Sequence, residues 1–384
     1  MKKLLCLSAA VIAFAGMISM GNQMKVGAQE ELTECKSAYL CEVTSGTEAY
    51  SVQPTKRLPI ASMCKIMTLL LTFEEVEGGR MSYDEPIVVS ENASGMGGSQ
   101  VFLQTGLSYP VQDLIKSVVV CSANDSCVAL AERICGSEAN FVDRMNERAR
   151  GLGACDTLFA NCTGLPKDPQ YSCAKDVAAM FRELIKHEKY FEYSKIWTED
   201  MRHPDGRTTV MTNTNKLVRF LDGCDGGKTG YTAQAGFCLA ATVCRGGVRL
   251  ISVVIGANTS DVRFQNTKNM INYAFSNYEK RICLSSKNEL EQTARVSGSA
   301  VKEIKLIPSH DLTVFLPKGS DKKCEVVIEI NENVCAPVEK EEVLGNATLY
   351  LDGVEVDCCK LLSSESAEKF SWFEALEEII HAWN

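Results

Sequence analysis

The sequence predicts an α/β fold of the α+β kind, in which helices flank an antiparallel sheet, followed by a small all-β domain and a C-terminal amphipathic helix. Three observations predict it: two hairpin-like pairs of runs far apart in the chain, helix-like runs between them, and a change of composition beyond Cys283. The chain has 384 residues, which is room for two domains, because single cores stop growing at roughly 250 to 300 residues.

The strands of the first domain come in two pairs. Residues 39–43 and 49–52 flank a Thr-Ser-Gly-Thr turn and predict a hairpin. Residues 236–243 and 248–255 are apolar runs joined by Cys-Arg-Gly-Gly and predict a hairpin of buried strands. We expect one antiparallel sheet with strands from both ends of this segment, covered by the helices that lie between them.

Two of the expected helices show clear apolar periodicity. The first covers residues 62–76, with apolar side chains at helical spacing at Ile66, Leu69, Leu70 and Phe73. Ser62 is the expected N-cap of this helix, because a hydroxyl can accept a hydrogen bond from the first turn. The second helix is marked by Phe141, Met145, Ala149 and Leu152.

Beyond Cys283 the sequence reads as a second domain. Residues 285–300 are polar, and short alternating runs follow at 301–306 and 326–330, which is typical of a small β-sandwich. The predicted organisation is therefore a leader over 1–28, a catalytic domain over 29–284, a β-sandwich over 285–359, and a linker with an amphipathic helix over 360–384.

The C-terminal helix has two open interpretations. Its apolar residues fall near one helical face: Phe370, Phe373, Leu376, Ile380 and Trp383. That pattern is typical of an interfacial helix and predicts peripheral membrane contact. The acidic polar face instead favours docking on the protein's own surface.

The first 28 residues have the pattern of a cleavable export signal. Lys2 and Lys3 precede an uncharged run from Leu4 to Met20, and small residues end at Ala28. An uncleaved anchor is the alternative, although the run is short for a span of about 20 residues. Cleavage would change the formal net charge from −9 to −12. We expect no nucleic-acid partner, because phosphate binding needs clustered Lys and Arg.

Cysteine usage is unusual for an exported protein. The chain holds 18 cysteines, of which 17 would remain after cleavage, scattered through apolar segments. An odd and scattered set argues against a disulfide framework. We interpret these residues as small apolar side chains in a protein exported to a reducing or oxygen-free setting. There is no C-x-x-C pair and no Cys/His cluster, so no metal or other cofactor is expected.

The first candidate for chemistry is an S-x-x-K sequence at the start of the helix over 62–76. Residues three apart share a helical face, so the Lys65 amine can reach the Ser62 hydroxyl. Lys65 can then act as the base that activates Ser62, if burial and neighbouring cations lower its pKa. Cys64 lies about 100° around the helix from Lys65 and should face another direction.

Two further motifs follow. Ser-Ala-Asn at 122–124 lies between two helix-like runs, where a hydroxyl and a carboxamide can face one cavity; a cap on the second helix is the alternative. Lys-Thr-Gly at 228–230 precedes an apolar strand and offers a docking edge for an extended peptide that ends in a carboxylate. A P-loop is excluded, because the first glycine of its pattern would fall on Asp222.

Together and in this order, the three motifs are a signature of penicillin-binding proteins and β-lactamases. Between about residues 39 and 275 the chain resembles the D-alanyl-D-alanine carboxypeptidases among the low-molecular-mass penicillin-binding proteins, in PIASMCKIMT, GGSQVFLQTG, CSANDSCVALAE, NCTGLP, NTNKLV, DGGKTGYT and RFQNTKNMINYAF. The resemblance implies a β-lactamase-like fold, and the β-domain and tail are similar to that family's second domain and anchor. The family usually has threonine where Cys64 stands.

The resemblance implies a serine acyl-enzyme reaction. Ser62 would attack the carbonyl between two D-alanines, with Lys65 as its base, and Ser122 would pass a proton toward the leaving D-alanine. The substrates would be peptidoglycan stem peptides ending in D-Ala-D-Ala, and β-lactam antibiotics would be covalent inhibitors. The site of action would be the outer face of the cytoplasmic membrane or the cell wall space. Cys64 would be structural.

The resemblance also implies how the substrate binds. Asn124 would hold the peptide's amide, while Lys228 and Thr229 would bind the terminal carboxylate. Gly230 would complete the docking edge. The N–H group of Tyr231 and that of the nucleophile itself would form the oxyanion hole.

The sequence also bears on several other functions. A class A β-lactamase has an additional glutamate for deacylation, whereas the segment NCTGLPKDPQYS contains none. A D,D-endopeptidase would use the same residues on a longer substrate. A Ser-His-Asp hydrolase lacks its G-x-S-x-G motif, and a thiol protease lacks a local signature. A non-catalytic wall-binding scaffold stays open.

Overall fold

The structure is a computed structural model that describes residues 32–372. The expected leader over 1–28 and residues 373–384 of the expected C-terminal helix lie outside the described residues. Within 32–372, no helix is both long and apolar enough to cross a membrane.

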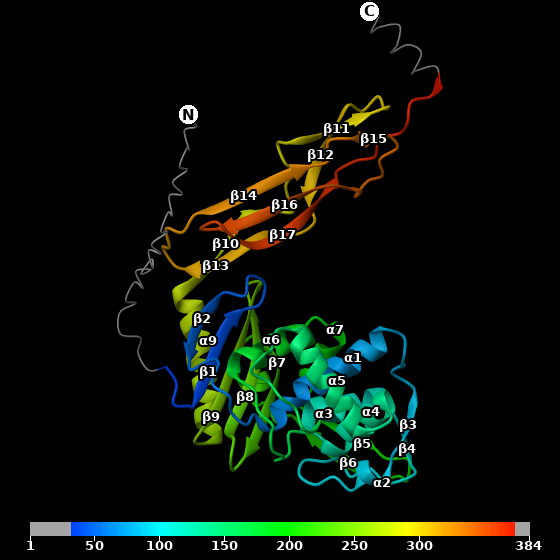
Figure 1. Cartoon of the computed structure of the whole chain (residues 1–384), viewed down its shortest axis with the longest axis vertical. Helices are drawn as coiled ribbons and strands as arrows, with labels where there is room; N and C mark the ends of the chain where they lie inside the picture. The colour runs from blue at the N-terminus through cyan, green and yellow to red at the C-terminus, as the bar shows by residue number, and fades with distance from the viewer. Residues whose placement is uncertain (1–31, 373–384) are drawn as a thin grey trace, which may run out of the picture. The chain divides into compact units, whose positions relative to one another are not determined.

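A five-stranded antiparallel sheet forms the centre of the first part of the chain, with strand order β2-β1-β9-β8-β7 (Figure 1). Its strands are β1 (Ser37–Glu42), β2 (Glu48–Val52), β7 (Cys224–Thr232), β8 (Gly236–Arg245) and β9 (Val248–Ala257). Both predicted hairpins are present, and β1 pairs with β9 from Ser37↔Ile255 to Glu42↔Leu250. The expectation that strands from both ends of the segment meet in one sheet is therefore confirmed. The strand β7 lies at the edge of the sheet.

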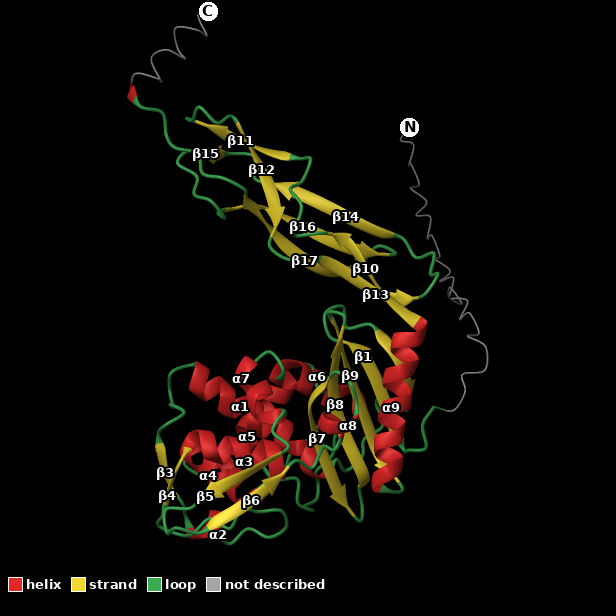
Figure 2. Cartoon of the chain, turned by 180° about the vertical axis from the view of Figure 1, so that it is seen from behind, coloured by secondary structure: helices red, strands yellow, loops and turns green. Residues whose placement is uncertain are grey.

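Helices cover both faces of this sheet. Figure 2 shows α9 along one face, where it packs on β8 and β9, while α6 packs on the other face against β1 and β9. The helices are α1 (Lys65–Glu77), α2 (Glu91–Ser94), α3 (Val111–Cys121), α4 (Asn124–Cys135), α5 (Glu138–Gly151), α6 (Ala174–Leu184), α7 (Glu188–Ser194), α8 (Leu217–Phe220) and α9 (Ser260–Asn277). Two short antiparallel pairs accompany them: β3 (Pro86–Val88) with β4 (Ser108–Pro110), and β5 (Thr198–Arg202) with β6 (Thr208–Thr212).

The start of the first helix differs from the prediction. A 3₁₀ turn, η1 (Ala61–Cys64), precedes α1, and Cys64 occupies the N-cap position without a side-chain cap. The expectation that Ser62 caps this helix was therefore wrong. The physical reason is that the chain enters the helix through the 3₁₀ turn, so Ser62 lies inside that turn, two residues before the N-cap position.

From Tyr278 to Ser363 the regular elements are all strands. They are β10 (Tyr278–Leu284), β11 (Thr293–Ser297), β12 (Glu303–Pro308), β13 (Leu312–Pro317), β14 (Cys324–Ile330), β15 (Val334–Cys335), β16 (Val343–Leu351) and β17 (Val354–Ser363). They form a six-stranded sheet in the order β14-β16-β17-β12-β11-β15 and a β10-β13 pair, around a separate apolar core. The alternating burial along β14 agrees with the predicted alternating run. The domain boundaries at 284 and 359 stay a prediction.

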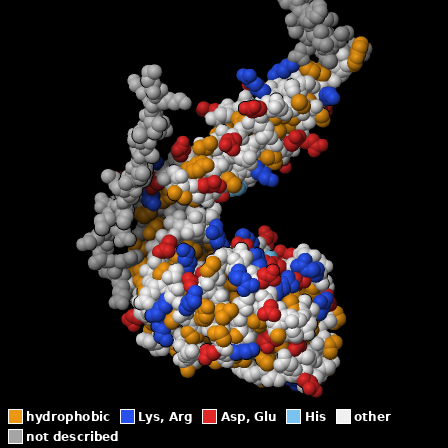
Figure 3. Space-filling view, in the orientation of Figure 1, with side chains coloured by type: hydrophobic (Ala, Val, Ile, Leu, Met, Phe, Trp, Pro, Cys, Tyr) orange, Lys and Arg blue, Asp and Glu red, His pale blue; other side chains and the backbone are white. Residues whose placement is uncertain are grey.

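Charged side chains of both signs are mixed over the visible face of the molecule (Figure 3).

Candidate active site

The turn η1 and the first residue of α1 bring Ser62 and Lys65 together. Lys65 Nζ donates a hydrogen bond to Ser62 Oγ over 3.0 Å and a second, close one to the carbonyl oxygen of Thr163. The predicted reach of the lysine is confirmed, although a 3₁₀ turn rather than an α-helix separates the two residues. This turn packs against β7 and β8 of the sheet and against α1.

Lys65 is buried without exposed surface, which changes its proton affinity. Removal of the ammonium from water disfavours the charged form, so burial lowers the pKa of Lys65 from its ordinary value. A lowered pKa makes the free amine accessible nearer neutral pH, which is what a general base for a serine requires.

The predicted Ser-Ala-Asn motif joins α3 to α4. Ser122 ends α3 in the left-handed region with φ 67°, and Asn124 begins α4. A non-glycine residue in this region carries strain, and such strain gathers at functional sites. The left-handed residue turns the chain sharply, and Ser122 Oγ accepts a hydrogen bond from Lys228 Nζ at 2.8 Å.

Asn124 presents an unused acceptor. Its Nδ2 donates to the carbonyl oxygen of Gly97 at 2.6 Å, which fixes the orientation of the carboxamide. Its Oδ1 is buried and has no hydrogen-bond partner within residues 32–372. Since buried acceptors are normally satisfied, this atom marks a place for a donor from outside the chain.

The edge strand β7 carries the third motif. Lys228 is buried, and its pKa is lowered well below the ordinary value, first by burial and then by the charge of Lys65. Thr229 Oγ1 donates to Thr214 Oγ1 at 2.8 Å. Tyr231 is 57% exposed, and its ring lies 4.3 Å from that of Phe237 between centroids.

Gly230 sets the distance between β7 and the turn η1. A Cβ atom added at this position would lie 2.8 Å from the carbonyl oxygen of Ile60 and 3.0 Å from the backbone nitrogen of Ser62. Only a residue without a side chain lets the strand approach the backbone of Ser62 this closely. The structure thus joins Ser62 to Lys65, Ser122 to Lys228, and Gly230 to the backbone of Ser62. Asn124, Thr229 and Tyr231 are neighbours of these residues along the chain, and their share in one site stays a prediction.

Cys64 makes its side-chain hydrogen bond to the loop after α5, and none joins it to Ser62 within the described residues. Its side chain is fully buried, its Sγ donates to the carbonyl oxygen of Asn161 at 3.2 Å, and burial raises the pKa of its thiol. A buried thiol with a raised pKa is a poor nucleophile, because the thiolate is the reactive form.

Sequence reasoning missed two contributors. Arg263 of α9 is buried, donates to the carbonyl oxygen of Gly230 at 3.2 Å, and burial lowers its pKa to about 10. The other is Thr163, whose backbone carbonyl receives the Lys65 amine. In the sequence, these contributors appear only as one arginine at position 263 and an Asn-Cys-Thr-Gly run at 161–164. Neither pattern indicates which distant atoms the residues contact.

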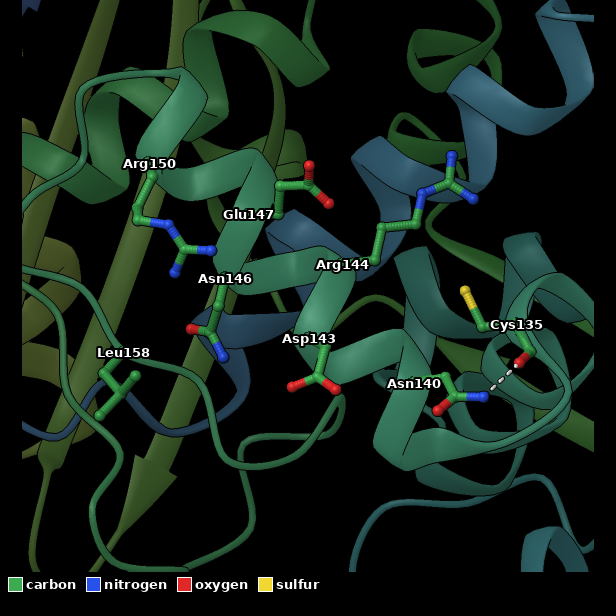
Figure 4. A pocket seen from close by; sticks show the side chains of 8 residues that line it. All are labelled: Cys135, Asn140, Asp143, Arg144, Asn146, Glu147, Arg150 and Leu158. Carbon is green, nitrogen blue, oxygen red and sulfur yellow. Dashed lines mark hydrogen bonds between the residues drawn. The ribbon is translucent and has the colours of Figure 1, made fainter.

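A pocket on the surface of α5 is distinct from this site. Figure 4 shows the residues that line it: Cys135, Asn140, Asp143, Arg144, Asn146, Glu147, Arg150 and Leu158. None of the predicted site residues lines it. Within the described part of the chain, no group of three or more His, Cys, Asp or Glu side chains could hold a metal ion.

Comparison with known proteins identifies the family. Residues 23–259 match the family model described as D-alanyl-D-alanine carboxypeptidase. The chain belongs to this family. As a member of the D-alanyl-D-alanine carboxypeptidase family it is an enzyme, a serine hydrolase. Residues 278–369 match a second model, the C-terminal domain of penicillin-binding protein 5.

Curated relatives agree over nearly the whole chain. The carboxypeptidase DacF of Bacillus subtilis is 36% identical, with 91% of this chain and 90% of the relative covered. The carboxypeptidase DacA of Haemophilus influenzae is 30% identical, with 91% of this chain and 89% of the relative covered.

Solved structures of penicillin-binding proteins share the fold. PBP3 of Streptococcus pneumoniae has a TM-score of 0.75 and 25% identity, with 87% of this chain and 99% of that chain covered. Penicillin-binding protein 5 of Haemophilus influenzae has a TM-score of 0.69 and 28% identity, with 89% and 100% covered. The predicted fold class, helices around an antiparallel sheet followed by an all-β domain, is confirmed.

Proposed function

We propose that this protein is a serine-type D-Ala-D-Ala carboxypeptidase that removes the terminal D-alanine from peptidoglycan stem pentapeptides and is acylated by β-lactams. The observation that carries the proposal is the 3.0 Å hydrogen bond between the buried Lys65 amine and Ser62 Oγ. This contact supplies the base that a serine nucleophile needs.

Acylation begins when Lys65 takes the proton of Ser62 as Oγ attacks the carbonyl carbon of the penultimate D-alanine. The tetrahedral intermediate collapses when the C–N bond breaks. Ser122 gives its hydroxyl proton to the departing amine and takes up in its place the proton that Lys65 removed from Ser62. Lys228 supports this transfer, because it donates to Ser122 Oγ at 2.8 Å and stabilises negative charge on that oxygen. The products are an ester on Ser62 and free D-alanine, and water then hydrolyses the ester.

The substrate binds as an added strand along the free edge of β7. Lys228 and Thr229 bind the terminal carboxylate, and the unsatisfied Oδ1 of Asn124 accepts the peptide's amide N–H. The backbone N–H groups of Ser62 and Tyr231 receive the oxyanion. The close approach at Gly230 supports this last assignment, because it places the strand against the backbone of the nucleophile.

We place the protein outside the cytoplasmic membrane, at its outer face or in the cell wall space. Two features support this location: the leader pattern over 1–28 and the family's substrate, which is extracytoplasmic. Peripheral contact of the C-terminal helix with the membrane stays part of this proposal.

The test is mass spectrometry and peptide mapping after incubation with penicillin, on wild type, Ser62→Ala and Cys64→Ala. We expect a penicilloyl adduct on the Ser62 peptide of wild type and Cys64→Ala and none in Ser62→Ala. The same wild-type protein should release D-alanine from a pentapeptide ending in D-Ala-D-Ala. An adduct on Cys64, or no adduct together with no D-alanine release, would refute the proposal.

A further inference from the structure

The segment between α5 and α6 reaches the catalytic pair through the loop 161–165. Asn161 fastens this loop onto itself: its Oδ1 accepts from the backbone N–H groups of Gly164 at 2.7 Å and Thr163 at 3.2 Å. Its Nδ2 donates to the carbonyl oxygen of Leu165 at 2.8 Å. One buried carboxamide therefore satisfies three backbone groups and fixes the path of the loop.

Three side chains at the start of α1 hold the three successive carbonyls of residues 161–163. Cys64 Sγ lies 3.2 Å from the first carbonyl oxygen and Thr68 Oγ1 lies 2.7 Å from the second. Lys65 Nζ donates to the third, that of Thr163. Gly164 allows this contact, because an added Cβ would overlap the carbonyl oxygen of Ala61 at 2.1 Å.

The third contact bears on the direction of the base. A neutral amine has two N–H donors and one lone pair, and only the lone pair can accept the Ser62 proton. When one N–H is committed to the Thr163 carbonyl, rotation about the last carbon–nitrogen bond of Lys65 is restricted. The lone pair can then face Ser62 Oγ, 3.0 Å away.

We propose that Asn161 is a positioning residue for the general base, because it fixes the Thr163 carbonyl against Lys65 Nζ and thereby directs the amine's lone pair to Ser62. The inference rests on the proposed function, in which Lys65 removes the Ser62 proton. Asn161 itself touches no reacting atom.

The carbonyl also affects the proton affinity of Lys65. A hydrogen bond from an ammonium is stronger than one from a neutral amine, so the Thr163 carbonyl partly offsets the effect of burial on the pKa of Lys65. Other titratable groups lie near Lys65 on β7, η1, α3, α4 and the loop itself: Lys228, Cys64, Cys121, Cys127 and Cys162. Burial raises the pKa of each of these four thiols, so they stay neutral while Lys65 titrates.

The test is the pH dependence of the second-order rate of Ser62 acylation by a fluorescent penicillin in Asn161→Ala. We expect the plateau rate to fall roughly 10- to 100-fold, by analogy with the loss of outer partners that orient ligands in metal sites. The acid limb of this pH–rate profile should move to lower pH. The Lys65 ammonium loses its fixed acceptor, the Thr163 carbonyl, so the pKa of Lys65 falls further. Asn161→Ser, whose hydroxyl can accept from the Gly164 N–H, should recover part of both effects.

Asn146→Ala is the matched control. Asn146 clamps the same segment two residues earlier, since its Oδ1 accepts from Phe159 N–H at 2.8 Å and its Nδ2 donates to Phe159 O at 2.9 Å. It lies on α5 in the pocket of Figure 4, and both of its side-chain hydrogen bonds go to Phe159. The control should lose thermal stability while keeping the wild-type pH profile. If Asn161→Ala does not fold, Thr68→Val tests the same loop and should shift the limb in the same direction.

The outcomes separate this inference from the proposed function. Wild type that is not acylated at Ser62 would refute the proposed function itself. If wild type is acylated normally, an Asn161→Ala profile that matches Asn146→Ala would overturn the inference alone. An acid limb moved to higher pH would also overturn it, because water entry rather than the carbonyl would then control Lys65. If Thr68→Val is the only variant that folds, an acid limb at the wild-type pH would likewise overturn the inference.

Discussion

The substitution Gly230→Ala tests how closely β7 must approach the nucleophile. The added methyl group would lie 2.8 Å from the Ile60 carbonyl oxygen and 3.0 Å from the Ser62 backbone nitrogen, so the strand or the turn η1 must move. Both proposed oxyanion donors, the N–H groups of Ser62 and Tyr231, flank this contact. Loss of one such donor raises the barrier by roughly 3 to 4 kcal/mol in other acyl-transfer enzymes. We therefore expect acylation to slow about 100- to 1,000-fold.

A control on the same strand separates this effect from general overpacking. In Gly226→Ala the added Cβ would lie 2.9 Å from Cε1 of Tyr190 and 3.1 Å from Oγ of Ser194, a comparable clash away from the nucleophile. Each variant should lose about 1 to 3 kcal/mol of unfolding free energy. The assay is stopped-flow acylation by a fluorescent penicillin, with urea unfolding of the same samples. If Gly230→Ala is acylated as fast as Gly226→Ala, the close approach does not serve the oxyanion site.

Three further predictions follow from buried polar groups and from thiol exposure. Asp125 is buried and accepts from the backbone N–H groups of Val101 and Leu103, both at 3.1 Å, so Asp125→Asn should cost about 1 to 3 kcal/mol in urea unfolding. An unchanged midpoint would contradict this. Burial lowers the pKa of His203. As the pH falls, the imidazole is therefore protonated in the unfolded chain before it is protonated in the folded protein. The stability advantage of wild type over His203→Gln should be full above about pH 6.5 and shrink below it; a difference that is constant down to pH 5 would refute the sign. Among the thiols of the described residues, three are exposed and should react fastest with a thiol reagent in the native protein: Cys155, Cys335 and Cys358. Peptide mapping that finds faster labelling at a buried thiol would contradict this prediction.

Local patterns in the sequence were sufficient for much of the fold and site. The turn residues between 39 and 52 and the Gly-Gly turn at 246–247 specify hairpins through the backbone angles they permit, and both hairpins form. The three-residue spacing of Ser62 and Lys65 was enough to place the amine on the hydroxyl, because either kind of helical turn aligns such residues.

Contacts between distant segments could not be read in the same way. The carbonyl of Thr163 meets Lys65 across 98 positions of sequence, and the guanidinium of Arg263 meets Gly230 across 33. A backbone carbonyl has no sequence signature, since every residue carries one. The capping prediction for Ser62 failed because the sequence pattern does not show that a 3₁₀ turn precedes α1 and moves the N-cap position to Cys64.

Two buried lysines in one site form a coupled system rather than two independent groups. Lys65 and Lys228 are both buried, and the charge of Lys65 is the second cause that lowers the pKa of Lys228, so protonation of one disfavours protonation of the other. A substrate carboxylate at Lys228 would stabilise the ammonium there and leave Lys65 as the free amine. Binding would then select the protonation state that acylation needs. The acid limb of kcat for a D-Ala-D-Ala peptide should therefore lie below that of kcat/KM, because kcat reports the complex and kcat/KM the free enzyme. A kcat limb at the same or higher pH would show that the carboxylate does not bias the pair.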